Sequence, residues 1–354
     1  MFGPEERIAE IAAEYSLGVK KGDRVMVNTD VAGIPLAREI VKSCLKRGSR
    51  VWTEVHSDEL KFALLKHSKP FQLEWVPEHT LEELKNADVW IYVIAPEDTR
   101  IFSEIPPRRL SLYQRAREDV LNYPMRHSRW LFILYPTRAL AKEAGMRFAD
   151  YRRLIFSSII QDWEGYRKWK VLAELLESSD RVEIYGEETE LKFSVKGRKA
   201  LVFRGRHNLP DGEILTSVVE NSVEGRVYFD VPSVYCYREV GGVTLVFRKG
   251  KVVRASARTG EPVLKGILRT DPGSKRLGEF GIGVNYALRR YTKNILVDEK
   301  IGGTVHLALG NGYRETLSRN VSGVHWDLIK DMRKEGEIYF DGSLVFRKGK
   351  WLKV

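Results

Sequence analysis

Two hydrophobic periods alternate along the first half of the chain. Apolar residues recur with helical spacing in segments such as 8–15 and 34–45, and short continuous apolar runs stand between those segments. Four of the runs have the length and composition of buried parallel strands: Arg24–Asn28, Val51–Val55, Val89–Ile94 and Trp130–Leu134. Strands and helices that alternate in this order predict an open, mostly parallel α/β sheet.

The period changes to two after Ser178-Ser179-Asp180, where strand-like segments begin at Arg181. We therefore predict an N-terminal α/β domain over residues 1–179 and a C-terminal α+β domain, rich in antiparallel strands, over residues 180–354. Within the second domain, helices are expected at Glu261–Arg269 and Asn285–Tyr291. Just before the boundary, three aromatic residues at helical spacing are expected to pack in a core or a domain interface: Trp163, Tyr166 and Trp169.

One heptapeptide, Leu-Val-Phe-Arg-Lys-Gly-Lys, occurs at Leu245–Lys251 and again at Leu344–Lys350. In both places it stands between strand-like runs, so each Lys-Gly pair predicts a hairpin turn that requires positive φ. An internal duplication would explain the repeat, but similar turn chemistry explains it more simply.

Composition indicates an ordinary soluble protein. Its 354 residues are enough for two cores, 43% are hydrophobic and 30% are charged. No apolar run is long enough to cross a membrane, and the N-terminus lacks the apolar stretch of a signal peptide. Cys44 and Cys236 are far apart and form no CxxC motif. This pattern excludes a cysteine-ligated zinc module and favours a cytoplasmic location.

The formal net charge of +11 allows a nucleic-acid partner. The 59 basic residues are, however, interleaved with 48 acidic ones, and no recognition motif accompanies them. A solvated surface explains the charge equally well. Nucleic-acid binding therefore remains an alternative only. The many charges and few cysteines and methionines also hint at a thermophilic source.

The segment 302–328 contains two histidines in apolar runs. On a strand, His325 and Asp327 would point to the same side, and His306 could face them from a neighbouring strand. Imidazole and carboxylate together suit a divalent metal ion. The simpler alternative is that His325 and Asp327 form a structural ion pair.

Two further acids have contexts that suggest more than an exposed turn. Glu213 follows a Pro-Asp-Gly turn at the start of an apolar run, and Glu279 lies among glycines and apolar residues. Either acid alone fits an exposed turn, because a lone buried carboxylate is costly. Together with the two histidines and Asp327, they supply enough ligands for two metal ions.

Four ordered motifs resemble the aminopeptidase T, aminopeptidase S and aminopeptidase II family of dinuclear metallopeptidases: Asn208–Thr216, Arg276–Glu279, His306–Gly310 and Val324–Asp327. The resemblance implies that two divalent ions (Zn, Co or Mn) are bound by Glu213, Glu279, His306, His325 and Asp327. Glu279 would bridge the ions. Tyr313 would face the site and steady an oxyanion or the leaving amine. The resemblance also implies a homodimer that accepts short peptides.

The chain departs from the family pattern at three places. The acid that precedes the first histidine in the family corresponds to Glu299, which lies two residues further from His306 than the pattern requires. Glu299 is therefore a sixth candidate ligand, at a position that departs from the family pattern. The connection from Tyr313 to His325 is shorter than in the family, and the final motif reads His-Trp-Asp-Leu. These differences concern the shape of the pocket and the choice of substrate.

The resemblance predicts a metallo-aminopeptidase in which a metal-activated water attacks the N-terminal peptide bond. Glu279 or Glu299 would transfer the proton to the leaving amine, and Trp326 with the apolar residues around His306 would keep the site dry. One alternative is a mononuclear Fe(II) ring-cleaving enzyme similar to the 2,5-dihydroxypyridine dioxygenases, which would use His306, His325 and Asp327. Another is a basic nucleic-acid-binding protein without enzymatic activity.

Overall fold

The computed structural model describes residues 3–235 and 238–352, which form two compact units. Unit 1 comprises Met1–Gln161 and Gly205–Pro210, and unit 2 comprises Asp162–Arg204 and Asp211–Val354. Within the described ranges, no helix is both long and apolar enough to cross a membrane. Cys44 is buried and has a free thiol, whereas Cys236 lies outside the described residues.

Unit 1 contains one parallel five-stranded sheet with the strand order β2-β1-β3-β4-β8. Its strands are β1 (Arg24–Asp30), β2 (Arg50–His56), β3 (Val89–Ile94), β4 (Arg129–Leu134) and β8 (Asn208–Leu209). The predicted open α/β sheet is confirmed, and the four apolar runs form its first four strands.

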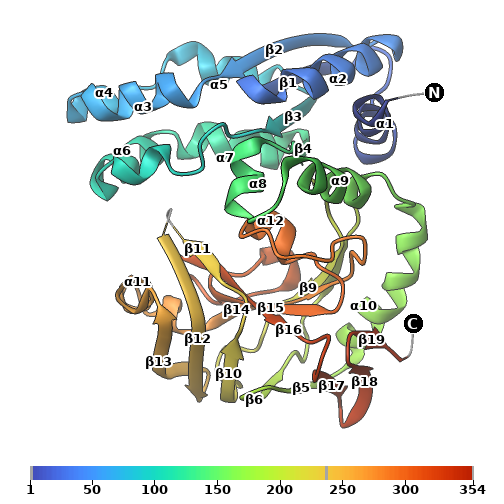
Figure 1. The fold of residues 1–354 in the computed structure, drawn as a ribbon, viewed down its shortest axis with the longest axis vertical. Coiled ribbons are helices and arrows are strands. Elements are labelled where there is room, and N and C mark those ends of the chain that lie inside the picture. The colour runs from blue at the N-terminus through green and yellow to red at the C-terminus, as the bar shows by residue number, and fades with distance from the viewer. Residues whose placement is uncertain (1–2, 236–237, 353–354) are drawn as a thin grey trace. The chain divides into compact units, whose positions relative to one another are not determined.

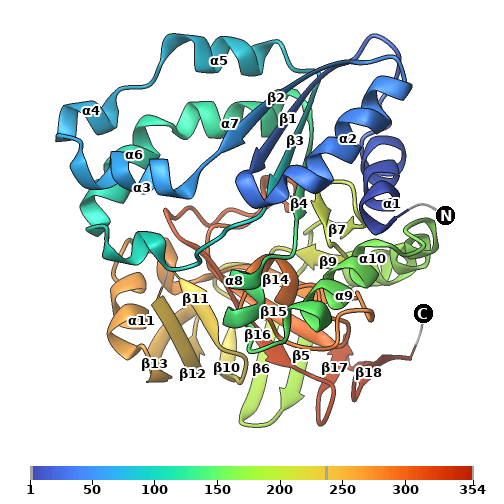
Figure 2. The ribbon, with the colours of Figure 1, turned by 45° about the horizontal axis from the view of Figure 1, so that its top comes forward.

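Helices cover both faces of this sheet (Figure 2). Met26 and Trp90 pack with Leu84 and Tyr123, which belong to the helices α5 and α7. The strand residues that alternate with these, such as Val25, point to the other face of the sheet. On that face, α2 packs on β1 and α1 packs on α2. The helices of unit 1 are α1 (Pro4–Glu10), α2 (Ile34–Lys46), α3 (Asp58–His67), α4 (Pro70–Glu74), α5 (Glu78–Lys85), α6 (Pro107–Ala116), α7 (Glu118–His127), α8 (Arg138–Glu143) and α9 (Phe148–Ile159).

Unit 2 contains two sheets, here called sheet B and sheet C, which are antiparallel throughout (Figure 1). Sheet B has nine strands in the order β11-β12-β10-β6-β5-β17-β18-β19, with β13 beside β12. They are β5 (Arg181–Gly186), β6 (Thr189–Ser194), β10 (Glu224–Phe229), β11 (Ser233–Tyr235), β12 (Arg238–Arg248), β13 (Lys251–Thr259), β17 (Glu337–Phe340), β18 (Ser343–Arg347) and β19 (Lys350–Trp351).

Sheet C has the strand order β16-β15-β14-β9-β7. Its strands are β7 (Ala200–Phe203), β9 (Glu213–Thr216), β14 (Leu277–Gly283), β15 (Thr304–Gly310) and β16 (His325–Asp331). The helices of unit 2 are α10 (Trp169–Ser178), α11 (Glu261–Ile267) and α12 (Ile295–Asp298). The two sheets pack on each other, and the rings of Phe193 on β6 and Phe280 on β14 meet edge to face at 5.2 Å.

Three details differ from the sequence prediction. The division between the units falls after Gln161 rather than near Ser179, because α10 packs on β7 and β9 of unit 2. β8, expected in the C-terminal domain, pairs in parallel with β4 of unit 1. No helix forms at 285–291, because the Asn285 N–H donates to the Lys300 carbonyl and the Asn285 carbonyl accepts from Gly302 N–H, which joins the segment to 300–302.

The two Lys-Gly hairpin turns are confirmed. Lys249 and Gly250 have φ of 49° and 72°, and Lys348 and Gly349 have φ of 48° and 84°. Positive φ at both central residues matches the twist of the flanking strands, which favours this turn in tight hairpins. Trp163, Tyr166 and Trp169 are also buried, as expected of packing residues.

Candidate metal centre

Four neighbouring strands of sheet C each present polar side chains to one face. Glu213 begins β9, Glu279 lies on β14, His306 lies on β15, and His325 and Asp327 lie on β16. Strand pairing fixes their proximity, because Ala308 lies opposite both Glu279 and Asp327 while Gly281 lies opposite His306. The period-two alternation of side chains then places all five on the same side of the sheet. All five belong to unit 2.

The other face of sheet C is mostly apolar, with Lys330 as an exception, and packs against sheet B. Phe280 and Trp326 point that way, and the Trp326 indole N–H donates to Ser233 Oγ at 2.9 Å. The expectation that Trp326 would keep the metal ligands dry is therefore wrong. It alternates with His325 and Asp327, so it must point away from them.

Glycines make room for the polar face. A Cβ atom at Gly281 would lie 1.9 Å from His306 Nε2, and one at Gly283 would lie 2.1 Å from the Ile301 carbonyl oxygen. Both glycines share the face of Glu279 because they follow it at two-residue steps. The imidazole of His306 thus occupies the space that a side chain at position 281 would fill.

The donor atoms divide into two groups that share Glu279. His306 Nε2 lies 3.3 Å from Glu279 Oε1 and 3.5 Å from Glu213 Oε2. His325 Nε2 lies 3.3 Å from Asp327 Oδ2, and one ligand atom from each of Glu279, His325 and Asp327 lies within 4.8 Å of the others. The first group is the set in which Glu213 and Glu279 each contact His306. The second is the compact group of Glu279, His325 and Asp327, whose ligand atoms are close enough to share one ion.

Backbone contact sets the orientation of the His325 ring. His325 Nδ1 lies 2.8 Å from the Asn311 carbonyl oxygen. A carbonyl oxygen only accepts hydrogen bonds, so Nδ1 must carry the proton. In a neutral ring, Nε2 then carries the free lone pair and points toward Asp327. Metal-binding histidines are commonly held in the same way, by a hydrogen bond from the other ring nitrogen.

A buried lysine enters the same cluster. Lys300 Nζ donates to Glu213 Oε1 at 2.8 Å and to Glu299 Oε1 at 2.6 Å. Glu299 therefore does lie beside the predicted ligands, but one of its oxygens is engaged by an ammonium group.

The protonation states reflect the crowding of four carboxylates. Burial raises the pKa of Glu213, Glu279 and Glu299 above the usual range. Burial also disfavours the charged forms of His325 and Asp327. The attraction between these two side chains is stronger, and it holds the pKa of His325 at about 11 and that of Asp327 at about 2. Burial lowers the pKa of His306, yet the hydrogen bond to Glu279 raises it to about 9. Without a metal ion, imidazolium protons offset the acids.

The donor set fits divalent metal ions. Ligands that share a tetrahedral ion at bond lengths near 2.1 Å are spaced about 3.4 Å apart, close to the separations of 3.3 and 3.5 Å found here. Among the described residues, the buried atoms Glu279 Oε2 and Asp327 Oδ1 have no hydrogen-bond partner. Such buried acceptors are costly unless a cation satisfies them.

Comparison with known proteins indicates a metal-dependent protein. The family model for thermophilic metalloproteases (M29) matches residues 5–351. The chain belongs to the M29 family. Among curated relatives, aminopeptidase 2 of Geobacillus stearothermophilus is 25% identical over 98% of this chain and 97% of its own. Aminopeptidase T of Thermus thermophilus is 24% identical over 98% of both chains.

Solved structures share the fold. The structure titled wild-type AmpT from Thermus thermophilus has a TM-score of 0.87 at 21% identity, covering 99% of both chains. A 2,5-dihydroxypyridine dioxygenase from Pseudomonas putida KT2440 has a TM-score of 0.65 at 13% identity, covering 100% of this chain and 99% of its own. At these identities the likeness concerns the fold alone.

Tyr313 reaches the same centre in this M29 protein. Its ring meets that of His325 nearly perpendicularly at 6.1 Å. Burial, and after it the carboxylates of Glu279 and Glu213, raise the pKa of Tyr313, although 42% of the residue is exposed. The phenol therefore stays protonated and can donate a hydrogen bond.

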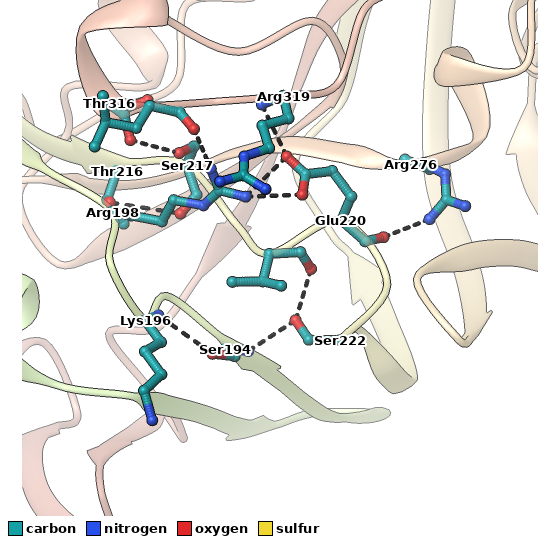
Figure 3. A network of polar contacts seen from close by, with 12 residues as sticks. Ser194, Lys196, Arg198, Thr216, Ser217, Glu220, Ser222, Arg276, Thr316 and Arg319 are labelled. Carbon is teal, nitrogen blue, oxygen red and sulfur yellow. Dashed lines mark hydrogen bonds and ion pairs between the residues drawn. The ribbon is translucent and has the colours of Figure 1, made fainter.

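A polar network anchors the short segment that carries Tyr313 (Figure 3). Ser217 Oγ donates to the Thr316 carbonyl at 2.8 Å, and the Arg319 N–H donates to Glu220 Oε1 at 2.8 Å. Arg198 pairs with Glu220 at 2.7 Å and also donates to the Leu317 carbonyl. The connection from Tyr313 to His325 is thus fastened to the chain that follows β9.

Sequence reasoning missed three contributors to the centre: Gly281, Lys300 and the Asn311 carbonyl. Gly281 had a detectable signal, since the Gly-x-Gly pattern beside Glu279 places bare positions on the ligand face of a strand. Lys300 had none, because a lysine next to a glutamate ordinarily indicates a solvated surface.

Proposed function

We propose that this M29 protein is a metal-dependent aminopeptidase that removes N-terminal residues from short peptides. The observation that carries the proposal is the gathering of Glu213, Glu279, His306, His325 and Asp327 on one face of sheet C. Relatives named aminopeptidases that match almost the whole chain support the choice of reaction.

The two donor groups would hold two divalent ions, drawn from Zn, Co or Mn, which these nitrogen and oxygen ligands accept. Glu279 is suited to bridge them, because Oε1 lies beside His306 while Oε2 is buried without a hydrogen-bond partner among the described residues. When bound, the ions would supply a water of lowered pKa and polarise the scissile carbonyl.

The side chains would position the peptide and move its protons. A carboxylate of the centre would accept the free α-amino group, which restricts cleavage to the N-terminus. Glu279 or Glu299 would receive the proton of the attacking water and pass it to the leaving amine. The protonated Tyr313 hydroxyl would donate to the oxyanion or to that amine.

Mononuclear oxygenase chemistry is the second candidate, since the fold resembles that of a dihydroxypyridine dioxygenase. It would require His306, His325 and Asp327 to hold one iron. Against it, the compact group of potential ligands contains Glu279 together with His325 and Asp327, while His306 faces Glu213 and Glu279. The hydrolase is therefore the better-supported proposal.

The remaining expectations belong to the same proposal. We expect a homodimer in the cytoplasm and no functional requirement for nucleic acid or a membrane. A nucleic-acid-binding protein without enzymatic activity would bind DNA or RNA in a salt-sensitive manner. It would give no account of the carboxylate and imidazole cluster.

Hydrolysis of Leu-p-nitroanilide and its N-acetylated form tests the proposal, with the protein stripped of metal and then supplied with Zn²⁺, Co²⁺ or Mn²⁺. We expect metal-dependent cleavage of the free-amine substrate only. Glu279→Gln should lower kcat/KM by at least about a hundredfold. Glu261→Gln removes a surface acid of α11 that pairs with Lys265, and should leave hydrolysis unchanged. Absence of cleavage with every metal, or equal cleavage of the blocked substrate, would refute the aminopeptidase.

A further inference from the structure

The feature that the proposed mechanism leaves unexplained is the lysine inside the metal centre. The Lys300 side chain is 1% exposed, and its ammonium group contacts two carboxylates, Glu213 and Glu299. Burying an ammonium group is expensive unless anions compensate it closely, so these two contacts fix the position of the charge. A permanent cation therefore lies where metal ions are expected to bind.

This cation is attached to one donor group and not to the other. Glu213 uses Oε1 for Lys300, and its second oxygen, Oε2, lies 3.5 Å from His306 Nε2. Within the described part of the chain, the ion pairs of the Glu279 and Asp327 side chains are with imidazoles, which can give up a proton when a metal binds. The charge of Lys300 also acts on Asp327, but without a direct contact. The lysine cannot do so readily, because its ordinary pKa is far above neutral.

A fixed positive charge has two effects on a nearby divalent ion. It repels the ion directly, and it also competes for the negative charge of Glu213. Both effects act on the group formed by Glu213, Glu279 and His306 more than on the group formed by Glu279, His325 and Asp327, since only the first includes a carboxylate that holds Lys300.

We propose that Lys300 makes the two metal positions unequal, so that the first ion binds tightly with His325 and Asp327 and the second binds weakly with Glu213 and His306. The inference rests on the proposed two-ion site. Like-charge repulsion at an effective dielectric near 20 predicts dissociation constants that differ by at least about tenfold. Occupancy of the second position then follows the free concentration of the metal.

The chain contains a matched control for burial of a lysine. Lys330 on β16 is 2% exposed, but its Nζ donates to two neutral carbonyl oxygens, those of Glu187 and Tyr228, both at 3.1 Å. Replacing Lys330 disturbs a buried ammonium group without removing charge from the carboxylate cluster. Lys330→Met should therefore leave the ratio of the two metal affinities unchanged.

The test is equilibrium dialysis of the metal-free chain against buffered Mn²⁺ or Zn²⁺, with bound metal measured by mass spectrometry. The wild type should show two steps, and Lys300→Met should bring their midpoints together by at least about tenfold. Lys300→Arg keeps the charge and should retain two separate steps. Because Lys300→Met leaves two buried carboxylates unpaired, Lys300→Met with Glu299→Gln is measured beside it and should give the same convergence.

Equal affinities in the wild type, or an unchanged ratio in both variants that lack the lysine charge, would overturn the inference. Its failure is distinct from failure of the aminopeptidase. Two unequal steps without peptide hydrolysis would retain the role of Lys300 and reject the enzyme. Peptide hydrolysis with two equal steps would do the reverse.

Discussion

His306 and Gly281 lie opposite each other on the paired strands β15 and β14. The orientation of the His306 ring depends on the absence of a side chain at Gly281. The imidazole nitrogen that faces Glu213 and Glu279 lies in the space above the bare glycine. A histidine that would otherwise stand upright on the sheet can thus lie against β14. The sequence predicted His306 as a ligand, but the space that orients it comes from a residue 25 positions earlier, as the pairing of Gly281 with His306 shows.

Gly281→Ala should displace the His306 ring, because the added Cβ would lie 1.9 Å from Nε2. We expect a loss of about 1–3 kcal/mol in stability from overpacking, together with weakened binding of one metal ion. Differential scanning calorimetry and metal titration would measure both. Gly266→Ala on α11 is the control, since a Cβ there meets nothing within 4 Å. An unchanged metal titration for Gly281→Ala would contradict this role of the glycine.

At the scale of elements, the local sequence predicted the structure correctly where a segment's conformation depends on its own residues. The repeated heptapeptide forms two hairpin turns, because Lys-Gly supplies positive φ at both central positions in either context. The helix predicted at 285–291 does not form, because the backbone N–H and carbonyl groups at the start of the segment are hydrogen-bonded to the backbone of 300–302. Residue spacing alone gives no sign of such a competitor.

The two hairpins allow a paired test of turn strain against tertiary contact. Gly250 and Gly349 have similar φ, but a Cβ at Gly250 would lie 1.8 Å from the Glu220 carbonyl oxygen, whereas one at Gly349 would find nothing nearer than 3.4 Å. Gly349→Ala should cost about 1 kcal/mol for the left-handed backbone. Gly250→Ala should lower the free energy of unfolding by about 1–3 kcal/mol more than Gly349→Ala, because the backbone at Glu220 must move to admit the methyl group. Urea unfolding monitored by tryptophan fluorescence compares them, and equal midpoints would reject the contact as the source of the difference.

At the scale of the whole molecule, the net charge of +11 coexists with a strongly acidic interior site. Glu213, Glu279, Glu299 and Asp327 are all buried or nearly so, and among the residues that the structure describes their ion pairs are with Lys300 and the two imidazoles. Binding of divalent ions must therefore displace protons from the imidazoles.

Metal binding should release protons and strengthen as pH rises. In the metal-free protein, the pKa values of about 9 for His306 and about 11 for His325 mean that both rings are protonated at neutral pH. Only the neutral rings bind metal, so saturation should release about two protons per chain, and affinity should fall as pH decreases. Titration calorimetry in buffers of different ionisation enthalpy counts the protons. His325→Gln should release about one fewer, and heats that do not depend on the buffer would contradict the prediction.

The sequence by itself determined the α/β rhythm of unit 1, the hairpin turns and the placing of His325 and Asp327 on one side of a strand. These follow from hydrophobic period, turn chemistry and strand alternation, which act over a few residues and place His325 beside Asp327 without help from elsewhere. Tertiary structure alone decided that β8 joins the sheet of unit 1 and that Trp326 faces sheet B. It also decided that Lys300 enters the metal centre, through a contact with Glu213 that spans 87 residues. Such contacts depend on which strands become neighbours, and local spacing carries no information about that choice.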